Sequence, residues 1–197
     1  MKKLCIASTN KGKIWELKSL LDGVFELYLL EDFGALPEAE EPFESFLKNA
    51  KNKAKHYAKF TGMPTFSEDA GLCVRALNLF PGVRSKRFIA ESGGEQNAFA
   101  RLENMLAAKD DRRAEFVCVS VIFDPQSGQI FTGKGAMQGE IRFPAQGASG
   151  FGFDPIFTPV GYQQTIAELG ETVKSAIGHR GKSVRALLKN YREKMSS

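Results

Sequence analysis

Cysteine, histidine and tryptophan are scarce in this chain, which holds 3 Cys, 2 His and 1 Trp in 197 residues. Cys5, Cys73 and Cys118 are odd in number, widely spaced and set inside apolar segments, a pattern that favours neither a disulfide framework nor a metal knuckle. Thiols used in this way are typical of a reducing compartment, so we expect a cytoplasmic protein.

Long apolar runs are missing as well, since no stretch approaches the roughly 20 residues that a membrane-spanning helix requires. Lys2 and Lys3 precede a short apolar run, but the polar residues from Ser8 to Lys11 end it too early for a secretory leader. We interpret the run as a first strand and expect no membrane partner.

A large excess of charge of one sign is also absent. Lysine and arginine number 27 against 23 aspartates and glutamates, a formal net charge of +4, and the basic residues are spread along the chain. This balance suits either a mildly basic soluble protein or one with a small anionic ligand. Because no block of positive charge is present, we expect no stable nucleic-acid partner.

What is present is the composition of a globular protein, 43% hydrophobic and 25% charged. A chain of this length can bury a core without disulfides or metals to hold it together. We find no internal repeat, low-complexity tract or linker. The sequence therefore predicts one α/β domain over 1–197, built on a mixed sheet.

Hydrophobic periodicity and turn residues predict the elements of the first half. In order they are a strand over 3–8, a helix capped by Asn10 and ending at Asp22-Gly23, a strand over 25–30, an acidic loop over 31–41 and a helix from Phe43. The buried face of that helix is expected to hold Phe43, Phe46, Leu47, Ala50, Ala54, Tyr57 and Ala58. Residues 65–77 predict two short strands that meet at an acidic corner, Glu68-Asp69.

The second half predicts a hairpin between helices. In order we expect a basic loop over 81–87, a helix over 95–109, strands over 116–123 and 129–141, a glycine-rich segment over 147–152, and short helices from Gln164, the last over 182–194.

The segment Ser8-Thr9-Asn10-Lys11-Gly12-Lys13 joins the first predicted strand to a helix N-terminus. Such a junction offers free backbone N–H groups and the positive end of the helix dipole, and Lys13 adds a point charge. The segment is therefore a candidate phosphate-binding loop, although the same residues also serve simply to cap a helix.

Two acidic pairs, Glu40-Glu41 and Glu68-Asp69, are candidate ligands for Mg²⁺. Magnesium takes few protein carboxylates and leaves room for phosphate oxygens and water. An acidic pair in a loop is also commonly just solvated, which is the alternative for Glu40-Glu41. Asp69 fits that alternative less well, because its pair lies inside an apolar stretch.

A third group lies in the last third of the chain: Gly150-Phe151-Gly152-Phe153-Asp154, then Lys174, then His179-Arg180. Aromatic rings between glycines can stack on a nucleobase, and lysine and arginine can donate to a keto oxygen on its edge. The alternative is a glycine-bounded turn with two core phenylalanines. The Gly181-Lys182-Ser183 tripeptide resembles the end of a P-loop, but Ala176 replaces the first glycine and the residues before it predict helix, so a P-loop is excluded.

In their order and spacing these segments resemble the inosine triphosphate pyrophosphatase family, from Leu4 to about Leu188. The segments that carry the resemblance are Ser8 to Lys13, Glu40-Glu41, Phe46 to Lys53, Ser67 to Leu72, Pro81 to Ser85, Gly150 to Pro155, Ala167 to Leu169, Lys174 and His179-Arg180. The resemblance implies an elongated mixed β-sheet flanked by helices, with two lobes, an active-site cleft between them, and a homodimer.

The resemblance also implies a role for each matching residue. Asp69 would be the catalytic carboxylate that activates water, and Glu41 with Asp69 would hold magnesium. The triphosphate would be bound by Lys13 and Lys53 with Ser8, Thr9, Asn10, Lys11 and Gly12, and by the backbone of Ala70. The base and sugar pocket would hold Phe151, Gly152, Phe153 and Asp154, and the six-position oxygen would be read by Lys174, His179 and Arg180.

Four positions depart from the family pattern, which commonly has aspartate at Glu68, serine at Ala70 and Gly178, and an aromatic residue at Arg84. Glutamate at 68 keeps the charge but moves it by one methylene, and alanine at 70 removes a side-chain contact to the nucleotide. The implied activity is hydrolysis of ITP, dITP and XTP to the monophosphate and pyrophosphate, which clears them from the nucleotide pool. The alternatives are a related pyrophosphatase for modified or pyrimidine triphosphates, and a nucleotide- or RNA-binding module without catalysis.

Overall fold

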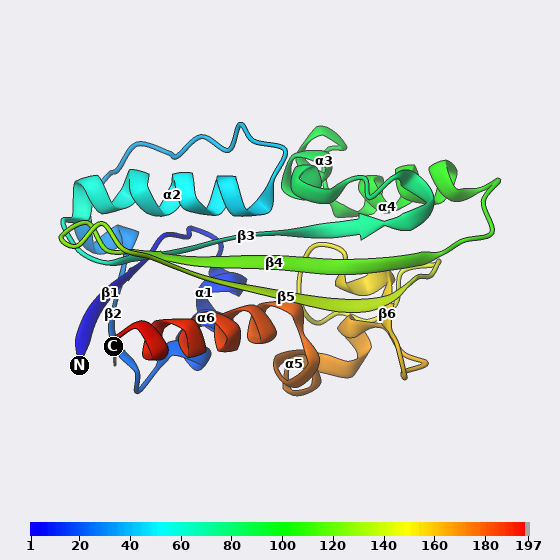
Figure 1. Ribbon diagram of the computed structural model, residues 1–197. Helices are drawn as coiled ribbons and strands as arrows, with labels where there is room; N and C mark the ends of the chain where they lie inside the picture. The colour runs from blue at the N-terminus through cyan, green and yellow to red at the C-terminus, as the bar shows by residue number, and fades with distance from the viewer. Residues whose placement is uncertain (196–197) are drawn as a thin grey trace. The chain divides into compact units, whose positions relative to one another are not determined.

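The computed structural model describes residues 1–195, which form a mixed sheet with helices packed against it (Figure 1). The strands are β1 (Lys2–Ile6), β2 (Phe25–Leu29), β3 (Thr65–Val74), β4 (Arg113–Phe123), β5 (Ile130–Ile141) and β6 (Phe157–Pro159). The α-helices are α1 (Lys11–Leu21), α2 (Phe46–Thr61), α3 (Ser85–Glu91), α4 (Glu95–Leu106), α5 (Ile166–Ile177) and α6 (His179–Met195). Short 3₁₀ turns cover Leu30–Phe33, Arg75–Leu77, Gly82–Arg84 and Asp154–Ile156.

Within residues 1–195 the sheet has six strands in the order β2-β1-β3-β4-β5-β6. β1 pairs in parallel with β2 and with β3, whereas β5 and β6 are antiparallel. The sheet is therefore mixed and open, as predicted. The parallel pairs place the loop after β1 and the adjoining part of β3 at the same edge, where loops of α/β sheets bind ligands.

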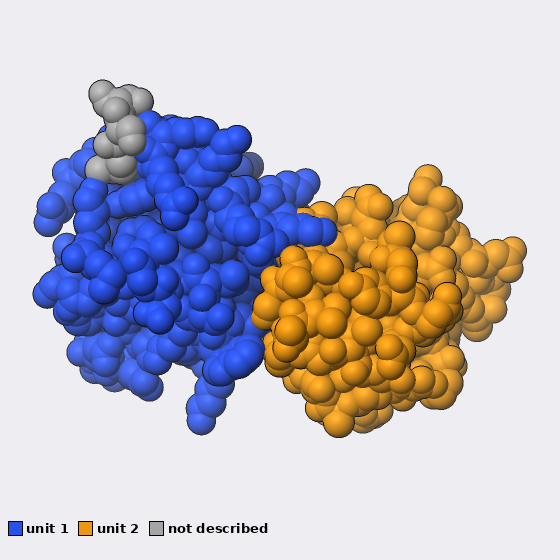
Figure 2. Space-filling view, turned by 90° about the horizontal axis from the view of Figure 1, so that it is seen from below, with its two compact units in different colours: residues 1–69, 118–135, 180–197 blue, residues 70–117, 136–179 orange. Residues whose placement is uncertain are grey.

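The chain divides into two compact units, coloured separately in Figure 2. Unit 1 comprises residues 1–69, 118–135 and 180–197, and unit 2 comprises residues 70–117 and 136–179. β3, β4 and β5 contribute residues to both units.

The core of unit 1 has two layers, because successive side chains of a strand point to opposite faces. On one face Leu4, Ile6, Phe66 and Ile122 pack with α1 and α6. On the other face, apolar residues of the strands pack against α2 and the loop before it; they include Cys5 and Val121. The sheet of unit 1 is thus covered on both sides.

The core of unit 2 forms where α3 and α4 pack against the outer ends of β3, β4 and β5. Its largest fully buried side chains include Phe88, Leu72 and Phe157. Gly71 lies where β3 passes the turn at Gly82, and a Cβ at Gly71 would clash with the carbonyl oxygen of Gly82. Only glycine allows this close approach of two backbones.

Two expectations about local structure are wrong. Residues 65–77 do not form two strands with a corner at Glu68-Asp69, because β3 runs without a break from Thr65 to Val74. The acidic pair lies in the middle of this strand, where both residues are buried. Pairing with β1 and burial on both faces outweigh the turn tendency of acidic residues and Gly71.

The second helix begins at Phe46, capped by Ser45, and not at Phe43. Phe43 and Leu47 are exposed, and the buried face includes Asn49 instead. The last helix begins at His179, three residues earlier than expected, and α3 occupies part of the segment expected to be a basic loop.

The described residues contain no helix long and apolar enough to cross a membrane. Cys5, Cys73 and Cys118 are buried free thiols. Neither a disulfide nor a cluster of three or more metal-ligating His, Cys, Asp or Glu side chains occurs between residues 1 and 195.

Candidate active site

The segment from Ser8 to Lys13 joins β1 to α1, as expected: residues 8–10 lie in the loop, and Lys11 to Lys13 form the first turn of α1. The Asn10 side chain accepts a hydrogen bond from the Lys13 backbone N–H at 3.0 Å, and the Asn10 N–H donates to the Ser8 hydroxyl at 3.3 Å. These two bonds fix the loop at the helix N-terminus. Thr9, Asn10 and Lys11 are exposed, so backbone N–H groups at the positive end of the α1 dipole can reach an anion from solvent.

β3 presents its two acidic side chains to opposite faces. Ser67 and Asp69 face α2: the Ser67 hydroxyl donates to the Ala50 carbonyl at 2.5 Å, and the Asp69 carboxylate accepts from the Asn49 side-chain amide at 3.1 Å. Glu68 faces the other side, where Arg180 of α6 donates to it. Strand alternation explains why neighbouring carboxylates have separate surroundings.

Asp69 is 6% exposed. Burial raises the pKa of its carboxyl to about 6; Lys53 and the Asn49 hydrogen bond oppose the rise, Glu41 adds to it, and Lys13 opposes it. A carboxyl group with a pKa near neutrality that is surrounded by lysines is suited to accept a proton during a reaction.

Lys53 is positioned by two contacts. Its amine forms an ion pair with Glu41 and donates to the backbone carbonyl of Glu68 at 3.2 Å. The Glu41 loop is tied to α2, because Asn52 donates to the carbonyl of Glu40 at 2.9 Å. Glu41 and Lys53 are also electrostatic neighbours of Asp69, which lies in another element of the chain.

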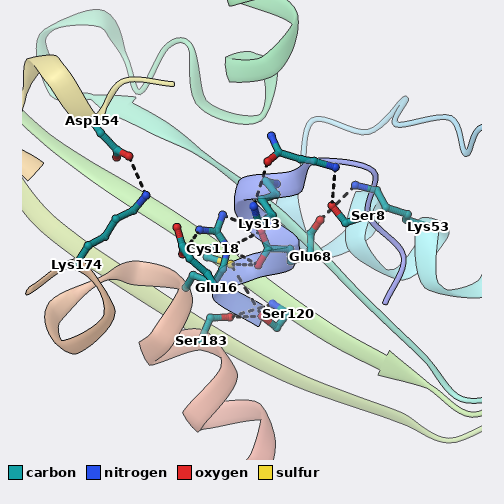
Figure 3. A network of polar contacts seen from close by, with 12 residues as sticks. Ser8, Lys13, Glu16, Lys53, Glu68, Cys118, Ser120, Asp154, Lys174 and Ser183 are labelled. Atoms are coloured by element: carbon teal, nitrogen blue, oxygen red, sulfur yellow. Dashed lines mark hydrogen bonds and ion pairs between the residues drawn. The ribbon is translucent and has the colours of Figure 1, made fainter. Parts of the chain in front are cut away.

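Glu68 lies in a second buried charge cluster, in which Figure 3 labels its partners Lys13 and Cys118 and also Glu16, which bonds to Arg180. The Arg180 Nε donates to both Glu68 oxygens at 2.9 Å, and its Nη1 donates to Glu16 at 2.5 Å. The Lys13 amine lies 3.2 Å from Glu68 Oε1. Burial alone would lower the pKa of Arg180, but Glu68 and Glu16 outweigh it, so the pKa lies above its ordinary value.

A third group of candidate residues lies within unit 2. The Lys174 amine donates to Asp154 Oδ2 at 2.8 Å, with both side chains at most 4% exposed (Figure 3). The same carboxylate accepts from the Phe151 backbone N–H at 2.9 Å, and the Lys174 amine lies 4.2 Å from the centre of the Phe151 ring. Asp154 thus ties the glycine-bounded turn to Lys174 of α5.

The remaining candidates of unit 2 are placed by packing. Phe153 is 3% exposed and belongs to the apolar core, whereas Phe151 is half-buried. The ring of His179 is stacked on Phe116 with centroids 4.8 Å apart. Gly152 donates its N–H to Glu95 at 2.6 Å, a bond that holds the turn against the start of α4.

The sequence profile of the Ham1 family matches residues 4–190. The chain belongs to the Ham1 family. The dITP/XTP pyrophosphatase of Desulfotalea psychrophila is 40% identical over 182 residues, which are 92% of this chain and 81% of the relative.

Solved structures show the same fold. A HAM1 protein from Coxiella burnetii is 35% identical with a TM-score of 0.88, covering 98% of this chain and 100% of that chain. The nucleoside-triphosphatase / dITP/XTP pyrophosphatase from Mycobacterium abscessus is 36% identical with a TM-score of 0.76, covering 94% and 97%. The resemblance seen in the sequence is thereby confirmed.

Glu41 and Asp69, the two residues expected to hold a divalent cation, are within electrostatic reach of one another. The two carboxylates act on one another, since Glu41 raises the pKa of Asp69, and a cation between them would relieve that repulsion. The described residues hold no cluster of three ligating side chains. Magnesium nevertheless suits a site of one or two carboxylates, because phosphate and water complete its shell.

Three residues with a place in these groups were not predicted as site residues: Glu16, Asn49 and Glu95. Asn49 lies outside the apolar face that was predicted for its helix, yet its amide reaches Asp69. Glu16 follows Lys13 by three positions on α1, a spacing that places both on one face of a helix, and this signal could have indicated it. No sequence pattern predicts the hydrogen bond between Glu95 and Gly152.

Proposed function

We propose that this chain hydrolyses purine nucleoside triphosphates with an altered base, namely ITP, dITP and XTP, to the monophosphate and pyrophosphate. Its membership of the Ham1 family and its 40% identity to a dITP/XTP pyrophosphatase support this activity. The outcome for a cell is removal of these nucleotides before a polymerase can use them.

The observation that carries the proposal is the buried Asp69 carboxylate with Lys13 and Lys53 among its charged neighbours. Lys13, in the first turn of α1, and Lys53 of α2 supply positive charge for the phosphate groups of a triphosphate. A carboxylate with a pKa of about 6 in the same place supplies a base.

In the proposed reaction the oxygen of a water molecule attacks the α-phosphorus, and the bond from that phosphorus to the α–β bridging oxygen breaks. Asp69 accepts a proton from the attacking water, and the electron pair of the broken bond leaves with pyrophosphate. Lys13 and Lys53 hold the β- and γ-phosphates and stabilise the charge that develops on the leaving group. Backbone N–H groups from Ser8 to Gly12 orient the triphosphate.

We propose Mg²⁺ as the cofactor, held by Glu41 and Asp69. When bound, it supplies electrostatic stabilisation of the phosphate oxygens and lowers the pKa of a bound water. Glu41 forms an ion pair with Lys53, so a cation that engages Glu41 leaves the Lys53 amine available to a phosphate oxygen.

We assign base selection to Lys174 of unit 2, together with His179, Phe151 and Asp154; Arg180, which the resemblance adds to this set, is buried with its guanidinium bonded to Glu68 and Glu16. Lysine and arginine donate hydrogen bonds and accept none, so they satisfy the keto oxygen of hypoxanthine or xanthine but oppose the amino group of adenine. A site built around such a bond can discriminate between the two bases by about 10⁴.

We also propose that the protein acts as a cytoplasmic homodimer. Light scattering of the purified protein checks the dimer.

The deciding experiment is pyrophosphate release from ITP, XTP, GTP, ATP and UTP, each with magnesium and with a chelator. Rapid, magnesium-dependent release from ITP and XTP alone is the expected result. Release from UTP or a modified triphosphate in preference to ITP would support the related pyrophosphatase instead. Binding of nucleotide without release of pyrophosphate would support the non-catalytic module.

A further inference from the structure

We infer that Glu68 is a positioning residue, which fixes the amine of Lys13 for the triphosphate and is not a metal ligand. The inference rests on the proposed function in assigning Lys13 to the triphosphate. It goes beyond that function because it gives a role to Glu68, which lies next to Asp69 but takes no part in the reaction itself.

The first observation is the direction in which Glu68 points. Asp69 faces α2, where Asn49 contacts it, while Glu68 faces α1 and α6, where its carboxylate contacts Lys13 and Arg180. A magnesium ion binds its ligands at about 2.0–2.1 Å. One ion cannot reach two carboxylates on opposite faces of a strand unless the strand itself rearranges.

The second observation is that the Glu68 carboxylate is already engaged by cations. Its side chain is 2% exposed and takes hydrogen bonds from Arg180 Nε to both oxygens, with Arg180 Nη2 at 2.9 Å and Lys13 Nζ at 3.2 Å from Oε1. Among these side chains the charges of Lys13 and Arg180 balance those of Glu16 and Glu68. A further cation would have to break bidentate, charge-assisted bonds of the strongest kind in proteins.

The third observation concerns both lysines of the phosphate site. Lys13 is held by the carboxylate of Glu68, and Lys53 donates to the backbone carbonyl of the same residue at 3.2 Å. Residue 68 therefore sets the placement of both amines, one through its side chain and the other through its backbone. A substitution of the side chain releases Lys13 and leaves the contact of Lys53 in place.

The test is a double-mutant cycle on KM and kcat for ITP with Glu68→Gln, Lys13→Met and the double variant. Glu68→Gln is expected to raise KM about tenfold with kcat changed less than threefold, whereas Lys13→Met is expected to raise KM at least as much and to lower kcat as well. The double variant is expected to be no worse than Lys13→Met alone, because Glu68 acts through Lys13. Multiplication of the two effects would overturn the inference.

Magnesium dependence supplies the second readout. The magnesium concentration for half-maximal activity is expected to stay within twofold of wild type in Glu68→Gln and to rise at least tenfold in Glu41→Gln. A tenfold rise in Glu68→Gln would make Glu68 a metal ligand.

Glu16→Gln is the matched control, since it removes the other carboxylate that bonds to Arg180. A KM increase equal to that of Glu68→Gln would assign the effect to the loss of buried charge and overturn the inference.

Inorganic tripolyphosphate, measured by calorimetry without magnesium, tests the inference apart from catalysis. Glu68→Gln is expected to weaken its binding about tenfold, whether or not the wild-type protein cleaves ITP. Where Glu68→Gln fails to fold, Glu68→Asp serves, because it keeps the charge and withdraws the carboxylate by about 1.5 Å. Partial weakening is expected for Glu68→Asp, and wild-type binding in that variant would overturn the inference.

Discussion

Glu68 and Asp69 are consecutive residues of β3, and their carboxylates lie on opposite faces of the strand, one bonded to Arg180 and the other to Asn49. The Asn49 face is the one that also brings Lys53 and Glu41 into electrostatic reach of Asp69. Two adjacent acidic residues therefore have separate surroundings, and substitutions can address each of them.

Asp69→Asn is expected to lower turnover of ITP to less than a tenth of wild type and to stabilise the fold. Turnover falls because an amide cannot accept the proton of the attacking water. Stability rises because burial penalises the charged form, which lifts the pKa from about 3.9 to about 6 and corresponds to about 1 to 3 kcal/mol at pH 8. Steady-state kinetics measure the turnover, and urea unfolding measures the stability. Turnover above a tenth of wild type would show that Asp69 is not the base.

The pKa of the Asp69 carboxyl, measured by NMR of the magnesium-free protein, is expected to lie near 6. Burial raises this pKa, so the carboxyl is protonated below about pH 6 and ionised above it. Because Glu41 raises this pKa and Lys53 lowers it, Glu41→Gln should move the titration to lower pH and Lys53→Met to higher pH. Shifts in the same direction in both variants would contradict this electrostatic arrangement.

Lys174→Met is expected to lower the ratio of the ITP hydrolysis rate to the ATP hydrolysis rate at least tenfold. The variant keeps a side chain of similar length beside Phe151 but removes the donor that a keto oxygen requires, and with it the hydrogen bond to Asp154. Lys109→Met, an exposed lysine of the same unit, is the matched control and should leave the ratio unchanged. An unchanged ratio in Lys174→Met would exclude this side chain from base selection.

Gly71→Ala is expected to destabilise the protein by about 1 to 3 kcal/mol, the range for a forced backbone shift in a packed region. The added methyl group would clash with the carbonyl oxygen of Gly82. The Ser85 hydroxyl, which donates to that carbonyl and accepts from the Leu72 N–H, would be displaced as well. Urea unfolding monitored by circular dichroism measures the change, and a loss below about 0.5 kcal/mol would show that the turn relaxes freely.

Local sequence patterns predicted the elements whose signals are local. Asn10 was identified as a helix cap because capping depends on residues within one turn, and it does cap α1. The hairpin of β4 and β5 followed from two apolar runs around a turn at Asp124 to Gly128, where the Gly128 N–H donates to the Asp124 carbonyl at 2.9 Å. The order and type of most elements could therefore be predicted.

Long-range pairing explains what the sequence could not predict. Glu68 and Arg180 are 112 positions apart, and no periodicity connects them. The expectation of a corner at Glu68-Asp69 was wrong. Both carboxylates are buried in an unbroken strand, and their hydrogen-bond partners come from elements far away in the chain. The direct roles of Asp69, Lys13 and Arg180 with substrate stay predictions that the experiments above address.

Cys118 contacts Glu68 and is fully buried, and burial raises the pKa of its thiol above its ordinary value. Alkylation of a thiol needs both the thiolate and access for the reagent, and the closed structure provides neither. The rate at which Cys118 is labelled therefore measures how often the region around Glu68 opens to solvent. This chain thus carries its own reporter of local opening beside Glu68, and a triphosphate that binds at Lys13, as proposed, should slow the labelling.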